Sequence, residues 1–221
     1  MAPLISIKAS DDKLEIVNQL LLPHTTQFIQ INTIEEAHDA IKTMKVGCRP
    51  NLTRFWLINK SKIRGAPAIA SLAALSVAQY LTRALRESSS PDYLLSLDSL
   101  KSHIDGILSF LYTSRPTAVN LGVATRRLTK TLNDGIAALK NPRAVAQDLV
   151  EEAKAVADED VGRNKQMSKW AGDWLLERVH KQGLDASRGL NVLTVCNTGS
   201  LATSVCLSIS FLPLTGNLIA W

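Results

Sequence analysis

The alanine-rich segment 68–85 limits the folds that this chain can adopt more than any other stretch of its sequence. Small side chains let neighbouring helices approach closely, so we expect a helix that is buried within a helical bundle. Gly65, Ala66 and Pro67 precede this segment, and proline suits the first turn of a helix because its missing N–H group would have no intrahelical partner there. The pattern therefore predicts a buried helix that begins near residue 66.

Most of the remaining sequence up to residue 161 also shows helical periodicity. Apolar residues recur at intervals of three and four positions in four further segments, 33–44, 97–112, 116–132 and 144–161. Thr33 is a suitable N-cap for the first of these, since Glu36 follows it three residues later. Three short segments near the N-terminus are rich in apolar or β-forming residues and predict a small sheet: 4–8, 13–17 and 26–31.

A second domain is predicted to begin after a linker-like stretch at residues 183–189. Residues 190–195 form a compact apolar run that ends in the sequence Cys-Asn-Thr-Gly, which is how the first strand of a parallel α/β domain commonly begins. We expect an α/β protein: an N-terminal α+β domain over residues 1–182, made of a small sheet and a helical bundle, and the start of a truncated Rossmann-like domain over 183–221.

Composition excludes several classes of protein. With 221 residues, 46% apolar and 20% charged, the chain is long enough for a sizeable core. Residues 1–13 mix charged and apolar positions, so we expect no secretory signal. Cys48, Cys196 and Cys206 are an odd set without Cys-x-x-Cys spacing, and the histidines show no metal-ligand spacing. These features predict a cytosolic protein without a disulfide framework or a metal site.

The net charge of +5 has a local origin. Four of the 25 basic residues lie in the segment 47–63, which contains no acidic residue, so the charge does not predict a nucleic-acid partner. The apolar C-terminal segment 204–221 is interrupted by Pro213, Gly216 and Asn217 and makes a poor membrane-spanning helix. We therefore expect neither nucleic acid nor a membrane as a partner.

Two arginines stand directly before predicted helix starts. Arg64 precedes Gly65 and Ala66, and Arg115 precedes Pro116, which biases it toward an extended conformation. A helix N-terminus presents unpaired N–H groups and a positive dipole end, so an arginine beside it suits a phosphate. The alternative for each motif is a plain helix start or surface turn with a solvated arginine. Two such motifs together suggest one shared anion.

Cys196 would lie at the carboxyl end of a strand, where open α/β sheets place their ligands. A thiol there could act as an acid or a base if its surroundings shift its pKa. The alternative is that Cys196 is a small buried apolar residue, which is the more common role of a single cysteine.

Three segments together, in this order, resemble the motifs of methylthioribose-1-phosphate isomerases: 64–70 (RGAPAIA), 115–121 (RPTAVNL) and 196–203 (CNTGSLAT). The resemblance covers most of residues 4–46 and 64–203. It implies a sugar phosphate substrate bound by Arg64, Gly65, Ala66 and Arg115, with Cys196 as the catalytic cysteine. It also implies isomerisation of an aldose 1-phosphate to a ketose 1-phosphate, no metal or organic cofactor, a homodimer of the complete protein, and a location in the cytoplasm or also in the nucleus.

The chain departs from the family pattern in two places. The family has a continuous Val-Arg-Gly-Ala run, whereas here Val46 and Arg64 are separated by residues 47–63. After Thr203 the family continues through the rest of a Rossmann-like domain, with a catalytic aspartate and an Asn-Lys pair, whereas residues 204–221 do not match it. We interpret both segments as translated introns, which transcript sequencing across the junctions tests, and we expect this chain to be impaired.

Two alternatives remain open within the same fold. The regulatory alpha, beta and delta subunits of initiation factor two-B share this fold without isomerising a sugar, and ribose-1,5-bisphosphate isomerases act on a substrate with a second phosphate. The motifs at Arg64 and Cys196 favour an enzyme.

Overall fold

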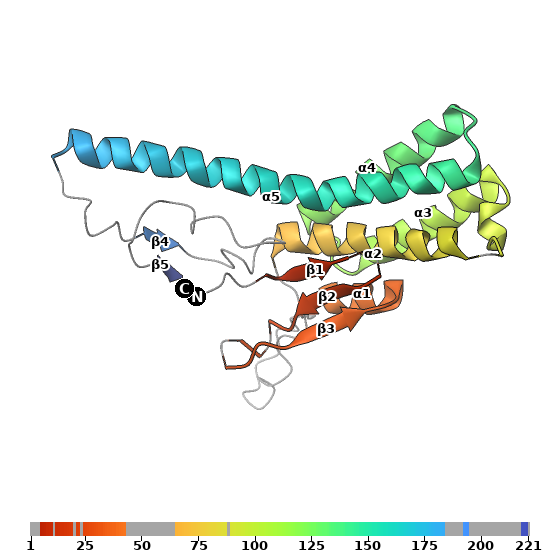
Figure 1. The fold of residues 1–221 in the computed structure, drawn as a ribbon, viewed down its shortest axis with the longest axis horizontal. Helices are drawn as coiled ribbons and strands as arrows, with labels where there is room; N and C mark the ends of the chain where they lie inside the picture. The colour runs from red at the N-terminus through yellow and green to blue at the C-terminus, as the bar shows by residue number, and fades with distance from the viewer. Residues whose placement is uncertain are drawn as a thin grey trace.

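The computed structural model describes residues 5–10, 12–19, 21–22, 24–42, 65–87 and 89–183, together with the backbone of residues 192–194 and 218–220. Arg64, Cys196 and the segment 47–63 lie outside the described residues, as does most of the segment 204–221. Within the described part the chain is mostly helical, with a small antiparallel sheet beside the helices (Figure 1). The expected combination of a small N-terminal sheet and a helical bundle is confirmed.

The sheet has three antiparallel strands in the order β1 (Ile7–Ala9), β2 (Leu14–Val17) and β3 (Phe28–Ile31). Ile16 of the central strand pairs with Ile7 on one side and with Ile29 on the other. Ile16 is fully buried, so this row of isoleucines faces the helices. The predicted strands are present, with β1 shifted toward the C-terminus relative to the predicted segment 4–8.

Helix α1 (Ile34–Ile41) begins where the sequence predicts. The N–H of Glu36 donates to the hydroxyl of the N-cap Thr33 (3.1 Å), and the Glu36 carboxylate accepts from the N–H of Asn32 (2.6 Å). The first bond satisfies a backbone donor that the first turn leaves unpaired, and the second ties the Glu36 side chain to the residue before the N-cap. Met44, which belongs to the predicted pattern, lies outside the described residues.

Helix α2 (Ala66–Arg86) is the central helix of the bundle, as its alanine content predicts. It packs against α4 (Val119–Ala137), α5 (Pro142–Lys181) and α1, and also touches β1 and β2. By length and composition α2 could span a membrane, but 72% of its most apolar window is buried inside the protein, as in the core helix of a globular fold. The helix thus supplies the common surface on which the other elements pack.

The remaining helices follow the predicted order with one large difference. A short 3₁₀ helix, η2 (Asp92–Leu94), leads into α3 (Leu97–Thr113), and α4 begins at Val119 because residues 116–117 form a turn after Arg115. The largest difference is α5, which has 40 residues instead of ending near residue 161. In Figure 1 its C-terminal half extends well beyond the other helices of the bundle.

The prediction missed the second half of α5 because the residues on its buried face change from apolar to polar or small. The apolar series on this face ends at Val156 and Ala157, and the face then continues through Asp160, Asn164, Ser168 and Gly172 at four-residue intervals. An apolar-periodicity argument stops where the buried residues become polar or small, which is why the prediction ended too early.

Two short parallel strands lie in the C-terminal region, β4 (Val192–Thr194) and β5 (Leu218–Ala220). β4 falls inside the predicted strand 190–195. β5 belongs to the segment 204–221, for which the sequence predicts no element.

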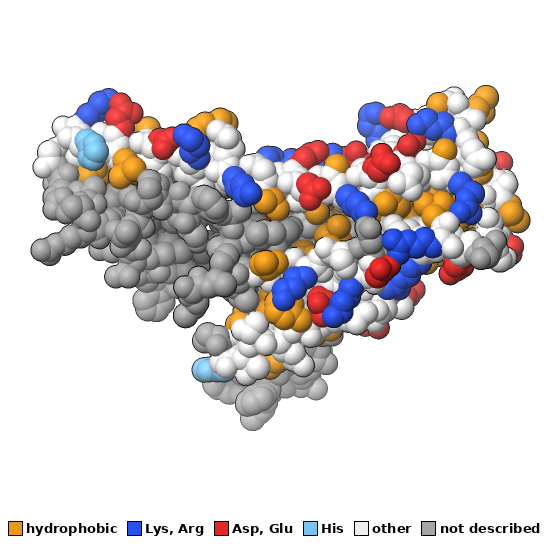
Figure 2. Space-filling view, viewed as in Figure 1, with side chains coloured by type: hydrophobic (Ala, Val, Ile, Leu, Met, Phe, Trp, Pro, Cys, Tyr) orange, Lys and Arg blue, Asp and Glu red, His pale blue; other side chains and the backbone are white. Residues whose placement is uncertain are grey.

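Charged side chains of both signs are mixed over the described residues of the face seen in Figure 2. Along α5 this mixing includes pairs four residues apart, such as Lys169 with Asp173 (2.6 Å) and Lys181 with Glu177 (2.6 Å). Such exposed pairs each contribute only a few tenths of a kcal/mol, roughly 0.3–0.5, to helix stability. They support the helical conformation of the C-terminal half of α5.

Helices α4 and α5 approach closely at Gly135, and this contact allows a test of the packing. A Cβ atom on Gly135 would lie 2.9 Å from Cγ2 of Val145, whereas nothing lies within 4 Å of a Cβ on Gly106 in α3. We expect Gly135→Ala to lower the free energy of unfolding by about 1–3 kcal/mol because the helices must separate. Gly106→Ala, the matched control, should raise it by up to about 1 kcal/mol through helix propensity. Urea unfolding of both variants measures the difference, and equal effects would contradict the close crossing.

Candidate active site

The N-termini of α2 and α4 lie at one cavity. Gly65 is the N-cap of α2 and Ala118 is the N-cap of α4, and neither helix has a side-chain hydrogen bond at its cap. The first N–H groups of both helices therefore have no intrahelical or N-cap side-chain acceptor. Pro67 from the first turn of α2 and Asn120 from the first turn of α4 both line the cavity. Two helix ends with a positive dipole thus meet at the same hollow, which suits an anion.

The cavity has a volume of about 700 Å³, within the range of small-molecule sites. Its third wall is the middle of α5, where the buried face changes from apolar to polar residues. Apolar lining residues include Ala70, Ala124, Val156 and Met167, and polar ones include Ser71, Asp160 and Asn164. A mainly apolar hollow with a few converging polar groups is the usual form of a small-molecule site.

The predicted site residues lie close to this cavity in sequence, although none of those described lines it. Gly65 is buried at the start of α2, and the exposed Ala66 follows it. Arg115 is half-buried in the turn before α4, where its carbonyl accepts a hydrogen bond from the N–H of Ala118 (3.0 Å). Arg64 and Cys196 lie outside the described residues, so their roles remain predictions.

Three buried polar residues of the cavity were not singled out by sequence reasoning. Asp160 is 7% exposed, Asn164 is 8% exposed, and the amide Nδ2 of Asn164 donates to Oδ1 of Asp160 (3.1 Å). Ser71 of α2 is 1% exposed. The signal that could have found the first two is their four-residue spacing, which continues the apolar face of α5 beyond Val156.

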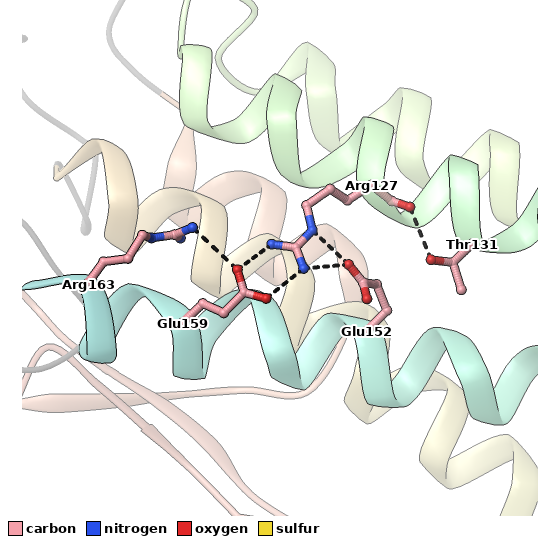
Figure 3. Close-up of polar contacts among 5 residues, drawn as sticks. All are labelled: Arg127, Thr131, Glu152, Glu159 and Arg163. Atoms are coloured by element: carbon pink, nitrogen blue, oxygen red, sulfur yellow. Dashed lines mark hydrogen bonds and ion pairs between the residues drawn. The ribbon is translucent and has the colours of Figure 1, made fainter.

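Arg127 of α4 is held at the edge of the cavity by two carboxylates of α5 (Figure 3). Its guanidinium donates to Glu159 through two nitrogens (2.8 and 2.9 Å) and to Glu152 (2.7 Å), and Arg163 also contacts Glu159 (3.3 Å). The hydrogen bond to Glu159, and after it the one to Glu152, raises the pKa of the Arg127 guanidinium above its ordinary value. The same bond lowers the pKa of Glu159. This network fastens α4 to α5 and leaves Arg127 engaged by carboxylates.

Two histidines have structural partners away from the cavity. His103 Nε2 lies 2.7 Å from the hydroxyl of Tyr80, and its ring stacks on Tyr93 with centroids 4.0 Å apart. His38 Nε2 lies 3.1 Å from the Thr113 hydroxyl. Within the described residues no group of His, Cys, Asp and Glu side chains is arranged to hold a metal ion.

The sequence profile of the Initiation factor 2 subunit family matches residues 62–210, which include both helix starts and all of α5. The chain belongs to this family. Curated relatives include proteins named methylthioribose-1-phosphate isomerase from Laccaria bicolor, 63% identical over 91% of this chain, and from Postia placenta, 56% identical over 92%. This chain covers 48% of each of those proteins, so it spans about half the length of the curated relatives that it matches.

Two solved structures share the fold of this member of the initiation factor 2 subunit family. The first, 5-methylthioribose 1-phosphate isomerase from Pyrococcus horikoshii, has a TM-score of 0.69 at 23% identity, over 99% of this chain and 60% of that one. The second, the delta subunit of translation initiation factor eIF-2B from A. fulgidus, has a TM-score of 0.66 at 29% identity, over 98% of this chain and 54% of that one. The first similarity, being below 25% identity, concerns the fold alone.

The Arg127 network gives this family member a testable dependence on pH. The pKa of Glu159 is lower in the folded chain than in the unfolded chain. The ionised Glu159 carboxylate therefore stabilises the fold at pH values above the ordinary glutamate pKa, and this stabilisation is lost as the pH falls through the pKa of Glu159 in the folded chain. We expect Glu159→Gln to lower the unfolding temperature at neutral pH by about 2–4 °C, since exposed pairs contribute at most about 1 kcal/mol. The difference should shrink in acid. Glu177→Gln, which breaks an exposed pair at the end of α5, is the matched control and should change little.

Proposed function

We propose that this chain is the N-terminal half of an isomerase that converts 5-methylthioribose 1-phosphate to 5-methylthioribulose 1-phosphate in methionine salvage. The observation that carries the proposal is the meeting of two uncapped helix N-termini, those of α2 and α4, at one cavity of suitable size. The names of the relatives at 63% and 56% identity support the same reaction. We infer that the part of the site beyond this chain belongs to a Rossmann-like domain that begins near residue 183.

The proposed roles follow the chemistry of the substrate. The phosphate is bound by Arg64 and Arg115 and by the N–H groups around Gly65 and Ala66, because a dianion favours guanidinium groups and the positive ends of helix dipoles. The anomeric oxygen carries this phosphate, so the sugar ring must open with assistance before hydrogen moves from C2 to C1. Cys196 is proposed to serve as an acid or base in these proton transfers. The reaction is an internal redox change in which C2 is oxidised and C1 reduced, and it needs no external cofactor.

The experiment compares three proteins on 5-methylthioribose 1-phosphate: the 221-residue chain, a hybrid of residues 1–203 joined to the C-terminal half of the Laccaria bicolor relative, and the same hybrid without residues 47–63. We expect turnover only in the hybrid without 47–63, since a loop inserted beside the phosphate site disturbs its geometry. Turnover by the 221-residue chain would show that the missing half is dispensable and would overturn the proposal that this chain is only part of the catalytic unit.

The same hybrid distinguishes the competing functions. An inactive but folded hybrid would favour a regulatory role like that of the delta subunit from A. fulgidus, whose structure this chain resembles with a TM-score of 0.66. Turnover of ribose 1,5-bisphosphate in place of the methylthio sugar would favour the bisphosphate isomerase. We further propose that the complete protein is a homodimer in the cytoplasm, or also in the nucleus, with neither nucleic acid nor membrane as partner. Sedimentation of the active hybrid tests the dimer.

A further inference from the structure

Ser71, Asp160 and Asn164 form a buried polar cluster, which we call the polar floor, in a cavity whose other walls include apolar side chains. Each of the three side chains is more than nine-tenths buried, and all three line the same hollow from two helices, α2 and α5. Burying polar groups in an apolar setting costs roughly 1–3 kcal/mol for each group left without a hydrogen bond. The Ser71 hydroxyl is such a group, so the polar floor can accept a ligand that offers this hydroxyl a hydrogen bond.

The hydrogen-bonding groups of the polar floor indicate what kind of ligand it can bind. Ser71 Oγ is buried and has no hydrogen-bond partner among the residues that the structure describes. Asn164 donates from Nδ2 to Oδ1 of Asp160 at 3.1 Å, which fixes the orientation of the carboxylate. An ionised carboxylate only accepts hydrogen bonds, and a hydroxyl both donates and accepts. The complement of the polar floor is therefore a group of O–H donors.

The charges around the cavity separate this subsite from the phosphate site. Arg127 and Arg163 are engaged by Glu152 and Glu159 at the rim. A phosphate dianion placed against the Asp160 carboxylate would be repelled, whereas the N-termini of α2 and α4 attract it. A ligand that carries a phosphate at one end and hydroxyl groups at the other would thus bind with its phosphate at the helix N-termini and its hydroxyl groups at the polar floor.

We propose that Asp160, held by Asn164, and Ser71 bind the ring hydroxyl groups of the sugar phosphate, with Asp160 accepting from the vicinal 2- and 3-hydroxyls. This inference rests on the proposed function, and it assigns the recognition of the sugar to α2 and α5 while the helix starts recognise the phosphate. A carboxylate that accepts a hydrogen bond from a ribose hydroxyl also recognises the sugar in dinucleotide-binding folds. The subsite selects for hydroxylated sugar phosphates over simple phosphates.

The test measures binding rather than turnover, on the 221-residue chain itself. Dissociation constants for ribose 1-phosphate, 2-deoxyribose 1-phosphate and inorganic phosphate are measured by ligand-observed NMR. We expect the parent chain to prefer ribose 1-phosphate over the deoxy sugar by about 10-fold, since a hydrogen bond to a charged group contributes roughly 1.5–3 kcal/mol. Asp160→Asn should abolish that preference and leave the binding of inorganic phosphate unchanged. Asp158→Asn, on the exposed face of the same helix, is the matched control and should keep the preference.

Three results would overturn the inference. A parent chain without a preference for the 2-hydroxyl, or an Asp160→Asn variant that keeps it, would exclude the assigned contact. Equal weakening of ribose 1-phosphate and inorganic phosphate would assign Asp160 a purely structural role. If Asp160→Asn does not fold, as judged by its unfolding transition, Ser71→Ala replaces it and should reduce the preference at least threefold. Because the hybrid's turnover tests the proposed reaction separately, an inactive hybrid with an Asp160-dependent preference would refute the reaction and keep the subsite.

Discussion

Leu72→Ala is expected to lower the free energy of unfolding by about 2–5 kcal/mol, the range for a large-to-small change in a close-packed core. Leu72 is completely buried on α2, the helix that packs against α1, α4 and α5 and also touches the sheet. A cavity at this position removes contacts on which several elements depend, and partial relaxation of one helix cannot fill it. The loss is large compared with the 5–15 kcal/mol typical of a whole domain.

Urea unfolding of the parent and the variant, followed by circular dichroism, measures this loss. Leu95→Ala is the matched control because Leu95 is 69% exposed, and it should change the free energy of unfolding by less than about 0.5 kcal/mol. Similar effects of the two substitutions would mean that α2 is not the centre of the core.

Cys196→Ser in the active hybrid is expected to lower turnover by about 10²–10⁴-fold, the usual contribution of a positioned acid or base. Serine keeps the shape of the side chain, but its hydroxyl does not ionise in the range where a thiol does, near a pKa of about 8.5. Because the change leaves the proposed phosphate-binding residues Arg64 and Arg115 in place, the Michaelis constant should change little. Arg115→Ala should show the opposite pattern, with weaker substrate binding as the main effect.

Steady-state kinetics of the two hybrid variants separate these effects, and the unfolding temperature of each variant shows that the fold is retained. Near-normal turnover of Cys196→Ser would make the alternative reading of Cys196 correct, namely a small apolar residue at the end of a strand.

The described secondary structure was largely predictable because its signals are local. Thr33 with Glu36 marked the start of α1, and alanine content with Pro67 marked the start and the burial of α2. The length of α5 was not predictable in the same way. Beyond Val156 its buried face consists of polar and small residues, and only tertiary contact shows that these residues lie inside.

The candidate site was predictable only in part. Arginine, glycine and proline at helix starts are local signals, so Gly65, Ala66 and Arg115 could be proposed from the sequence, together with Arg64 and Cys196, whose roles remain predictions. Ser71 could not be proposed, because a serine in a helix carries no signal until a cavity is known to lie beside it. Asp160 could not be proposed either, because it lies beyond the apolar series of α5 that ends at Val156 and Ala157, and only the structure shows that it is buried.

Helix α5 runs unbroken from Pro142 to Lys181 and lines the cavity with its middle part. Each residue of an α-helix turns its successor by about 100°, so inserting or deleting one residue ahead of Val156 would rotate Asp160 and Asn164 away from the hollow together. We therefore expect relatives of this chain to differ in length in their loops and at their helix ends. The number of residues within the part of α5 that leads to Asp160 and Asn164 should stay constant.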